Sequence, residues 1–209
     1  VCSSDLSRKI ATVLRVSAGA TTPSDAAKFA VVIDRAGLDQ LLSVLKSRGF
    51  ETIGPRVRDG AIVYDTIDSV AQLPAGWGDE QDGGKYRLRR RDDDALFGHV
   101  VGPHSWNKYL FPPAQQIFRA RRDGAGFVVE APAHAALKRA FIGVRSCELH
   151  AMAIKDRVFV RGEHRDPAYA ARRENVFIIA VNCGVAGGTC FCVSMNTGPR
   201  ATAGFDIAL

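Results

Sequence analysis

The chain has 209 residues, of which 46% are hydrophobic and 24% charged, and its formal net charge at pH 7 is +6. This length suits one large domain or two small ones, and the apolar content is sufficient to bury a core. No segment approaches the ~20 apolar residues of a membrane-spanning helix, and the N-terminus lacks a signal-peptide pattern, so we expect a cytoplasmic protein.

The first part of the chain, residues 1–97, is expected to be a mixture of helix and short strands. Leucines recurring three and four residues apart predict a helix over residues 35–48 with Asp34 as its N-cap. Residues 73–84 are polar and glycine-rich, and they predict a loop. The segments expected to be extended are residues 51–57 and 61–67 on either side of an Asp-Gly turn, residues 85–91, and residues 95–101.

Two arginine-rich runs, residues 87–91 and 119–122, raise the question of nucleic-acid binding. Three aspartates follow the first run directly and cancel much of its field. Aromatic residues are not interleaved with the arginines as a base-stacking surface requires. We therefore expect a solvated hairpin arm or a patch for an acidic protein partner, and no nucleic-acid partner.

The second part, residues 98–209, begins irregularly and then becomes regular. Residues 102–122 predict a turn, a short helical piece, a break at Pro112 and a second helix with Pro113 in its first turn. Residues 126–131 predict a strand.

From residue 139 the pattern is α/β. Two buried strands, residues 139–144 and 176–181, flank a helix that starts at Cys147 and a second helix capped by Asp166. Strand, helices and strand in this order predict a parallel crossover unit. We therefore expect an α/β (α+β) fold with a mixed sheet.

Four of the five cysteines lie in the last third of the chain. Cys147 and Cys183 each follow a predicted parallel strand, so both are expected at the carboxyl-terminal edge of the sheet. Cys190 and Cys192 follow a glycine-rich turn that can fold back toward them. This distribution favours metal or redox chemistry over structural disulfides.

Four thiolates around one centre indicate either zinc or an iron–sulfur cluster. Structural zinc usually takes its cysteines as C-x₂₋₄-C pairs, and this chain has none. A C-x-C beside a glycine-rich turn suits a larger inorganic core, because bare backbone N–H groups can approach its sulfides. A cluster is the favoured alternative, with zinc left open.

Four segments carry a family resemblance: "VVGPHSWNKYLFPPAQQIFR", "FIGVRSCELHAMAIKDRVF", "DPAYAARRENVFIIAVNC" and "GGTCFCVSMNTGP". Together they resemble the sulfhydrogenase beta subunit family, which is similar to the A subunit of anaerobic sulfite reductase. In that family an N-terminal domain of this type precedes a ferredoxin-like domain with two more clusters. The ferredoxin-type motifs are absent from this chain, which is expected to be an N-terminal fragment.

The resemblance implies one [4Fe-4S] cluster held by Cys147, Cys183, Cys190 and Cys192. It also implies redox partners: the missing ferredoxin-type domain, a flavin-bearing subunit, and a hydrogenase or sulfite-reducing catalytic subunit.

Other residues near the ligands are candidates for tuning the site. They are Arg145 as a nearby cation, Asn182 and Thr189 as hydrogen-bond donors to sulfur, and Gly188 as a point of close backbone approach. Weaker candidates are His104, Trp106 and His150, and Cys2 is expected to be a free thiol without a role.

The sequence thus predicts an electron-transfer domain of a multisubunit oxidoreductase with no catalytic residues of its own. A structural zinc-binding interaction domain and a flavin-binding domain remain as alternatives, although no dinucleotide or P-loop motif supports the flavin.

Overall fold

A computed structural model describes residues 12–16, 30–131 and 137–209 of the chain. A seven-stranded mixed sheet forms its centre, with the strand order β2-β1-β11-β10-β9-β3-β4. No helix in the described part of the chain is both long and apolar enough to cross a membrane. The strands are β1 (Thr12–Val16), β2 (Ala30–Ile33), β3 (Glu51–Arg58), β4 (Ala61–Thr66), β9 (Arg139–Val144), β10 (Val176–Ala180) and β11 (Ile207–Ala208).

The middle of the sheet is parallel and its two edges are antiparallel. β9 pairs in parallel with both β3 and β10, and β10 pairs in parallel with β11. β4 and β1 add to the two sides of this block in antiparallel pairings, and β2 then pairs antiparallel with β1. The predicted mixed α/β sheet with a parallel unit is confirmed.

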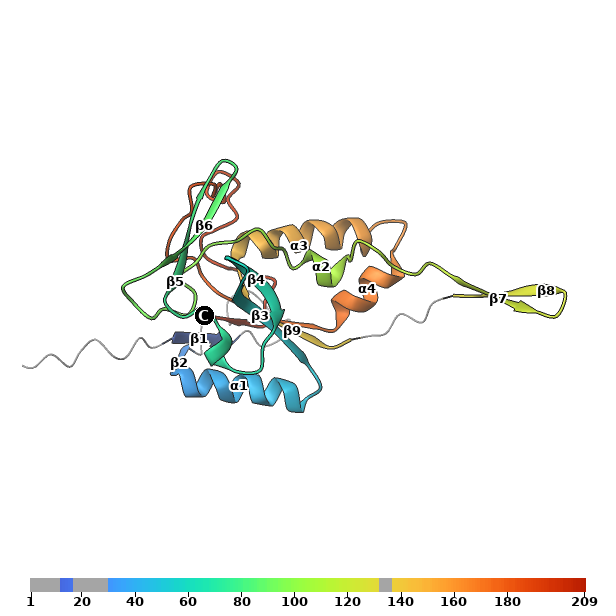
Figure 1. Cartoon of the computed structure of the whole chain (residues 1–209), viewed down its shortest axis with the longest axis horizontal. Helices are drawn as coiled ribbons and strands as arrows, with labels where there is room; N and C mark the ends of the chain where they lie inside the picture. The colour runs from blue at the N-terminus through green and yellow to red at the C-terminus, as the bar shows by residue number, and fades with distance from the viewer. Residues whose placement is uncertain (1–11, 17–29, 132–136) are drawn as a thin grey trace, which may run out of the picture.

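Helices cover both faces of the sheet, as Figure 1 shows. α1 packs on one face, while α2, α3 and α4 lie on the other. α3 and α4 connect β9 to β10, so the predicted crossover is present. The helical segments are α1 (Arg35–Ser47), the 3₁₀ turn η1 (Val70–Gln72), α2 (Asn107–Leu110), α3 (Ser146–Phe159) and α4 (Pro167–Glu174).

Because both faces are covered, successive residues of β9 and β10 enter different cores. Phe141 and Ile178 belong to the core under α2, α3 and α4, whereas Ile142 and Ile179 belong to the core under α1. All four side chains are almost fully buried. This alternation explains why both strands are continuously apolar in sequence.

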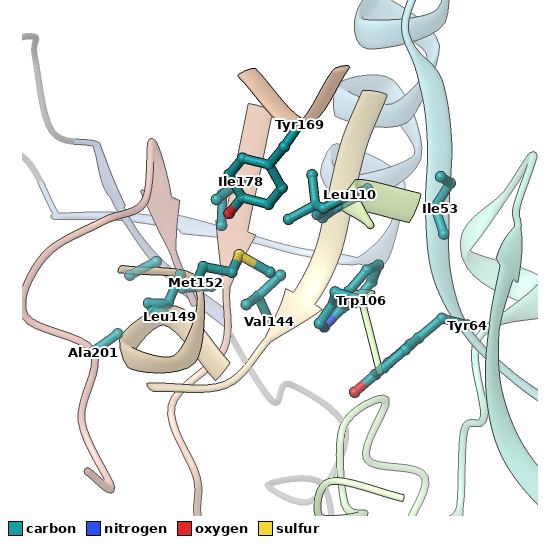
Figure 2. Packing of buried hydrophobic residues seen from close by; sticks show 13 residues of the cluster. Ile53, Tyr64, Trp106, Leu110, Val144, Leu149, Met152, Tyr169, Ile178 and Ala201 are labelled. Carbon is teal, nitrogen blue, oxygen red and sulfur yellow. The ribbon is translucent and has the colours of Figure 1, made fainter. Parts of the chain in front are cut away.

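Aromatic stacking organises the larger core (Figure 2). Trp106 is 1% exposed and lies between Tyr64, at a ring-centroid distance of 3.9 Å, and Phe141, at 4.7 Å. Met152 of α3 and Tyr169 of α4 complete this core. Each such side chain stabilises the fold by about 1.5–3 kcal/mol through burial.

Local signals set several element boundaries as predicted. Asp34 caps α1 by accepting the Gly37 N–H at 2.8 Å, and Asp166 caps α4 by accepting two N–H groups. The turn between β3 and β4 has positive φ at both Asp59 and Gly60, as a tight hairpin demands.

The polar segment 73–84 is not a loop throughout, because its second half is strand β5 (Trp77–Asp82). β5 pairs antiparallel with β6 (Lys85–Arg90), the strand that the sequence predicted. Gly83 and Gly84 make the turn between them. The strand is polar because it belongs to a surface hairpin outside the main sheet, so apolar alternation does not mark it.

The predicted strand at residues 95–101 is absent, and these residues are irregular. Side chains form hydrogen bonds to the backbone N–H and carbonyl groups here, in place of a neighbouring strand. Asp79 accepts the Val100 N–H at 2.8 Å, and Gln81 donates to the Val101 carbonyl at 2.7 Å. Arg145 donates to the carbonyls of Phe97 and His99.

The prediction of a second helix within residues 102–122 is also wrong. Residues 113–118 are irregular, and the chain then forms β7 (Arg119–Asp123), which pairs with β8 (Gly126–Glu130). The Gly124 turn, with φ of 58°, makes a local hairpin possible, and strand pairing takes precedence over the helical tendency. This hairpin projects from the body of the molecule (Figure 1).

Strands from both predicted portions share the central sheet, since β3 lies beside β9. The division at residue 97 stays a prediction. β1, β2 and β11 were not predicted, and Cys2 lies outside the described residues.

Candidate metal centre

Cys147 lies where β9 passes into α3. The helix begins at Ser146, one residue before the predicted start, so Cys147 is in its first turn. The thiol is therefore near the positive end of the helix dipole, one contribution that favours thiolate and that burial opposes. The hydroxyl of Ser146 donates to the Arg200 carbonyl at 3.0 Å and ties this turn to the segment after the other cysteines.

Cys183 follows β10 by three residues, as Cys147 follows β9. Because these strands are parallel neighbours, both cysteines come after the carboxyl-terminal ends of adjacent strands. The Cys183 N–H donates to the Pro199 carbonyl at 3.2 Å. This bond holds the returning chain beside Cys183.

Cys190 and Cys192 lie in an irregular segment that packs closely upon itself. The Gly187 N–H donates to the Sγ of Cys190 at 3.3 Å. A Cβ atom added at Gly198 would lie 3.2 Å from the Sγ of Cys192 and 3.7 Å from the Cβ of Ser146. Cys192 therefore lies next to the first turn of α3.

The thiols interact electrostatically with one another. Burial raises the pKa of Cys147 to about 11, and Glu148 and the thiols of Cys183 and Cys192 add to the shift. Burial also raises the pKa of Cys183, which Arg145 lowers and the thiols of Cys190 and Cys192 raise. All four cysteines are free thiols. The four cysteines that the sequence singled out are thus close enough to affect one another's pKa values.

The thiols do not converge on a single point. In residues 12–16, 30–131 and 137–209, no group of three or more His, Cys, Asp or Glu side chains is arranged to hold one metal ion. A four-iron cluster has a larger core than one ion, and its thiolates surround that core.

Arg145 is a buried cation and not a surface residue, being 2% exposed. Its guanidinium donates to the carbonyl of Asn182 at 3.0 Å and to the carbonyls of Phe97 and His99 at 2.9 and 2.7 Å. These three acceptors of the guanidinium N–H groups are neutral carbonyls, and none of them is a carboxylate. Its positive charge therefore remains available to neighbouring thiolates, and it lowers the pKa of Cys183.

Asn182 and Thr189 each have a partner other than sulfur. The Asn182 side chain accepts the Ala201 N–H at 2.8 Å and donates to the Leu209 carbonyl at 3.2 Å. The Thr189 hydroxyl donates to Oε1 of Gln81 at 2.9 Å. Both residues hold the cysteine-bearing segment in place.

Gly188 lies directly against β5. A Cβ atom added to it would lie 2.3 Å from the backbone oxygen of Gln81, so no other residue fits there without a shift. Figure 1 shows the β5–β6 hairpin beside the red segment that carries these cysteines. Gln81 was missed from the sequence, because its contact spans 108 residues along the chain and leaves no local signal.

Glu148 was missed as well, although an acidic residue in the first turn of a helix is a recognisable signal. Its carboxylate accepts the Arg145 N–H and the Tyr64 hydroxyl, both at 2.9 Å. Burial raises the pKa of Glu148 and raises that of Tyr64 well above its usual value. This buried network fixes the turn that presents Cys147.

The weaker candidates differ from one another in burial. Trp106 is packed in the core. His150 is exposed on α3, and His104 is partly buried after the irregular segment.

Comparison with curated proteins finds a relative in Pyrococcus furiosus, the sulfhydrogenase 2 subunit beta, which is 33% identical over 108 residues. The chain is distantly related to this subunit family. The match covers 49% of the chain and 28% of the length of that subunit. No family model matches the chain. No solved structure matches it either.

Proposed function

We propose that this chain is an electron-transfer domain in which Cys147, Cys183, Cys190 and Cys192 hold one [4Fe-4S] cluster. The observation that carries the proposal is the meeting of two distant parts of the chain. Cys147 and Cys183 follow neighbouring parallel strands. The chain that carries Cys190 and Cys192 returns beside them, where its Pro199 and Arg200 carbonyls accept the Cys183 N–H and the Ser146 hydroxyl. The relationship to a sulfhydrogenase subunit supports this chemistry.

The surroundings fit a cluster with thiolate ligands. The Gly187 N–H that points at Cys190 Sγ is a donor of the kind that tunes cluster potentials. The buried guanidinium of Arg145 offsets negative charge from the thiolates. When bound, such a cluster accepts and donates single electrons.

The protein's own contribution is to position the four thiols and to control their surroundings. The Glu148 network orients Cys147, and the hydrogen bond from Cys183 to Pro199 orients the second thiol. Cys190 is exposed, and Phe191, Val193 and Met195 beside it are 70%, 76% and 61% exposed. This apolar rim is where a redox partner could approach closely.

The partners we propose are other redox subunits: a ferredoxin-type domain, a flavin-bearing subunit, and a hydrogenase or sulfite-reducing catalytic subunit. The relative is itself named as a subunit of a sulfhydrogenase. The chain would then relay electrons and would not transform a substrate alone.

Anaerobic purification tests the proposal. We expect about four irons and four acid-labile sulfides per chain, and an electron paramagnetic resonance signal after reduction. Cys147→Ala and Cys190→Ala should each lose most of the iron, whereas Cys2→Ala should retain it. Bound zinc without sulfide, or equal iron loss from Cys2→Ala, would contradict the proposal.

A further inference from the structure

A second candidate site lies beside Cys183, whose neighbours Asn182 and Gly184 line it. It is a cavity of about 660 Å³, a size within the range of small-molecule sites. Its walls come from the N-terminal end of α1, the segment after β6, and the chain that follows β10 and β11. The cavity therefore opens at the carboxyl ends of the parallel strands, where ligands bind in open α/β sheets.

Both apolar and charged side chains line the cavity. Leu96, Phe97, Val181 and Leu209 contribute apolar surface. The cationic side chains that line it are Arg35, Arg91 and Arg200. An apolar body with a few placed polar groups is typical of sites for small organic ligands.

Most of the charged side chains that line the cavity already have a partner within the protein. Asp94 pairs with Arg35 at 2.8 Å, and Asp34 is occupied as the cap of α1. Arg91 is held by Asp93, just outside the cavity, at 2.6 Å. Within the described residues the guanidinium of Arg200 has no acceptor, so it is free to bind an anion.

A buried polar atom independently indicates a missing partner. His99 lines the same cavity and is 5% exposed, and its Nδ1 has no hydrogen-bond partner among the described residues. Leaving such an atom unpaired is costly, so native structures normally satisfy it with protein, water or ligand. A polar ligand group that reaches this wall is one way to satisfy it.

We infer that this cavity binds a mononucleotide, in which a phosphate monoester is attached to a planar ring system. Arg200 binds the phosphate, Phe97 and the aliphatic wall contact the ring, and His99 hydrogen-bonds to a polar ring atom. The ligand lies beside Cys183, because Asn182 and Gly184 on either side of that cysteine line the cavity. This site uses no cysteine thiol and does not depend on the proposed cluster.

Binding of two mononucleotides to the purified full chain tests the inference. FMN is followed by its fluorescence and AMP by calorimetry, with riboflavin and adenosine as the matched compounds without phosphate. We expect saturable binding of FMN or AMP, at least about tenfold tighter than the matched nucleoside. Absence of saturable binding of both at about 1 mM, or equal binding of the matched compounds, would overturn the inference.

Variants locate the site. Arg200→Gln should weaken mononucleotide binding about tenfold and leave the weak nucleoside binding unchanged. His99→Phe keeps an aromatic ring and removes Nδ1. It should weaken the binding of the mononucleotide and of its matched compound without phosphate to the same extent. Arg161→Gln removes the same charge from an exposed residue beyond α3 and should change nothing. Equal affinity of the chain and both cavity variants would overturn the assignment.

The same titrations on Cys190→Ala separate the two proposals. Mononucleotide binding should persist in this variant even though iron is lost. A chain that binds mononucleotide but never contains iron would refute the cluster alone, and a chain with iron but no mononucleotide binding would refute the cavity site alone.

Discussion

The two hairpins outside the main sheet, β5–β6 and β7–β8, are alike in local structure and opposite in their contacts. Each is an antiparallel ribbon with a tight turn that contains a positive-φ glycine, Gly84 in one and Gly124 in the other. Figure 1 shows β5–β6 against the cysteine-bearing segment and β7–β8 extended away from the body.

Side-chain hydrogen bonds account for the difference. Tyr86 of β6 accepts the Ile62 N–H at 3.1 Å, Asp79 of β5 accepts the Val100 N–H, and Gln81 accepts from Thr189. Every residue of β7 and β8 is exposed, including Phe127 at 72%. A two-stranded ribbon is marginally stable alone, so strand pairing by itself does not dock a hairpin.

The largest effect is expected where β5 meets the cysteine segment. Gly188→Ala places a Cβ atom 2.3 Å from the Gln81 backbone oxygen, so it should destabilise the fold by about 3 kcal/mol and reduce bound iron. Urea unfolding and iron analysis measure both changes. Gly184→Ala is the control, because no atom lies within 4 Å of its added Cβ. Equal effects from both variants would show that the segment is not held against β5.

A smaller effect is expected from the aspartates of the two hairpins. Asp79→Ala leaves the buried Val100 N–H without its acceptor and should lower the free energy of unfolding by about 1–3 kcal/mol. The corresponding change in the projecting hairpin, Asp123→Ala, should stay within about 0.5 kcal/mol. Urea unfolding followed by circular dichroism compares them. A similar loss from the two variants would remove the distinction between the hairpins.

The single bond between Thr189 and Gln81 should contribute less. Thr189→Val removes only the donor of this exposed bond and should cost about 0.5 kcal/mol. Backbone amides of residues 187–190 should then exchange faster with deuterium, as mass spectrometry can measure. Thr202→Val, at an exposed position without this contact, should leave their exchange unchanged. Unchanged exchange in Thr189→Val would mean that other contacts hold the segment.

The smallest effect is expected on the projecting hairpin. Phe127→Ser and Val129→Ser alter side chains that are 72% and 66% exposed, so the free energy of unfolding should change by less than about 0.5 kcal/mol. Thermal unfolding of the two variants and the parent chain checks this. A loss above about 1 kcal/mol would indicate that the hairpin packs on the body in solution.

Much of the fold was predictable because its signals are local. Asp34 and Asp166 cap their helices, the Asp59-Gly60 turn joins β3 and β4, and two apolar runs form the parallel pair β9 and β10. The same strands determine where Cys147 and Cys183 lie. These features depend on neighbours a few residues apart, so the sequence by itself determined them.

Tertiary contacts decided the rest. Residues 95–101 are apolar enough for a strand. However, the side chains of Asp79, Gln81 and Arg145, from other parts of the chain, form the hydrogen bonds to the backbone of this segment. The 37-residue separation along the chain gave no sign that the Arg145 guanidinium would donate to the Asn182 carbonyl. The contact of Gly188 with β5 was equally hidden. Such contacts form only when the folded chain brings remote polar groups together, because each must replace its lost hydrogen bonds to water.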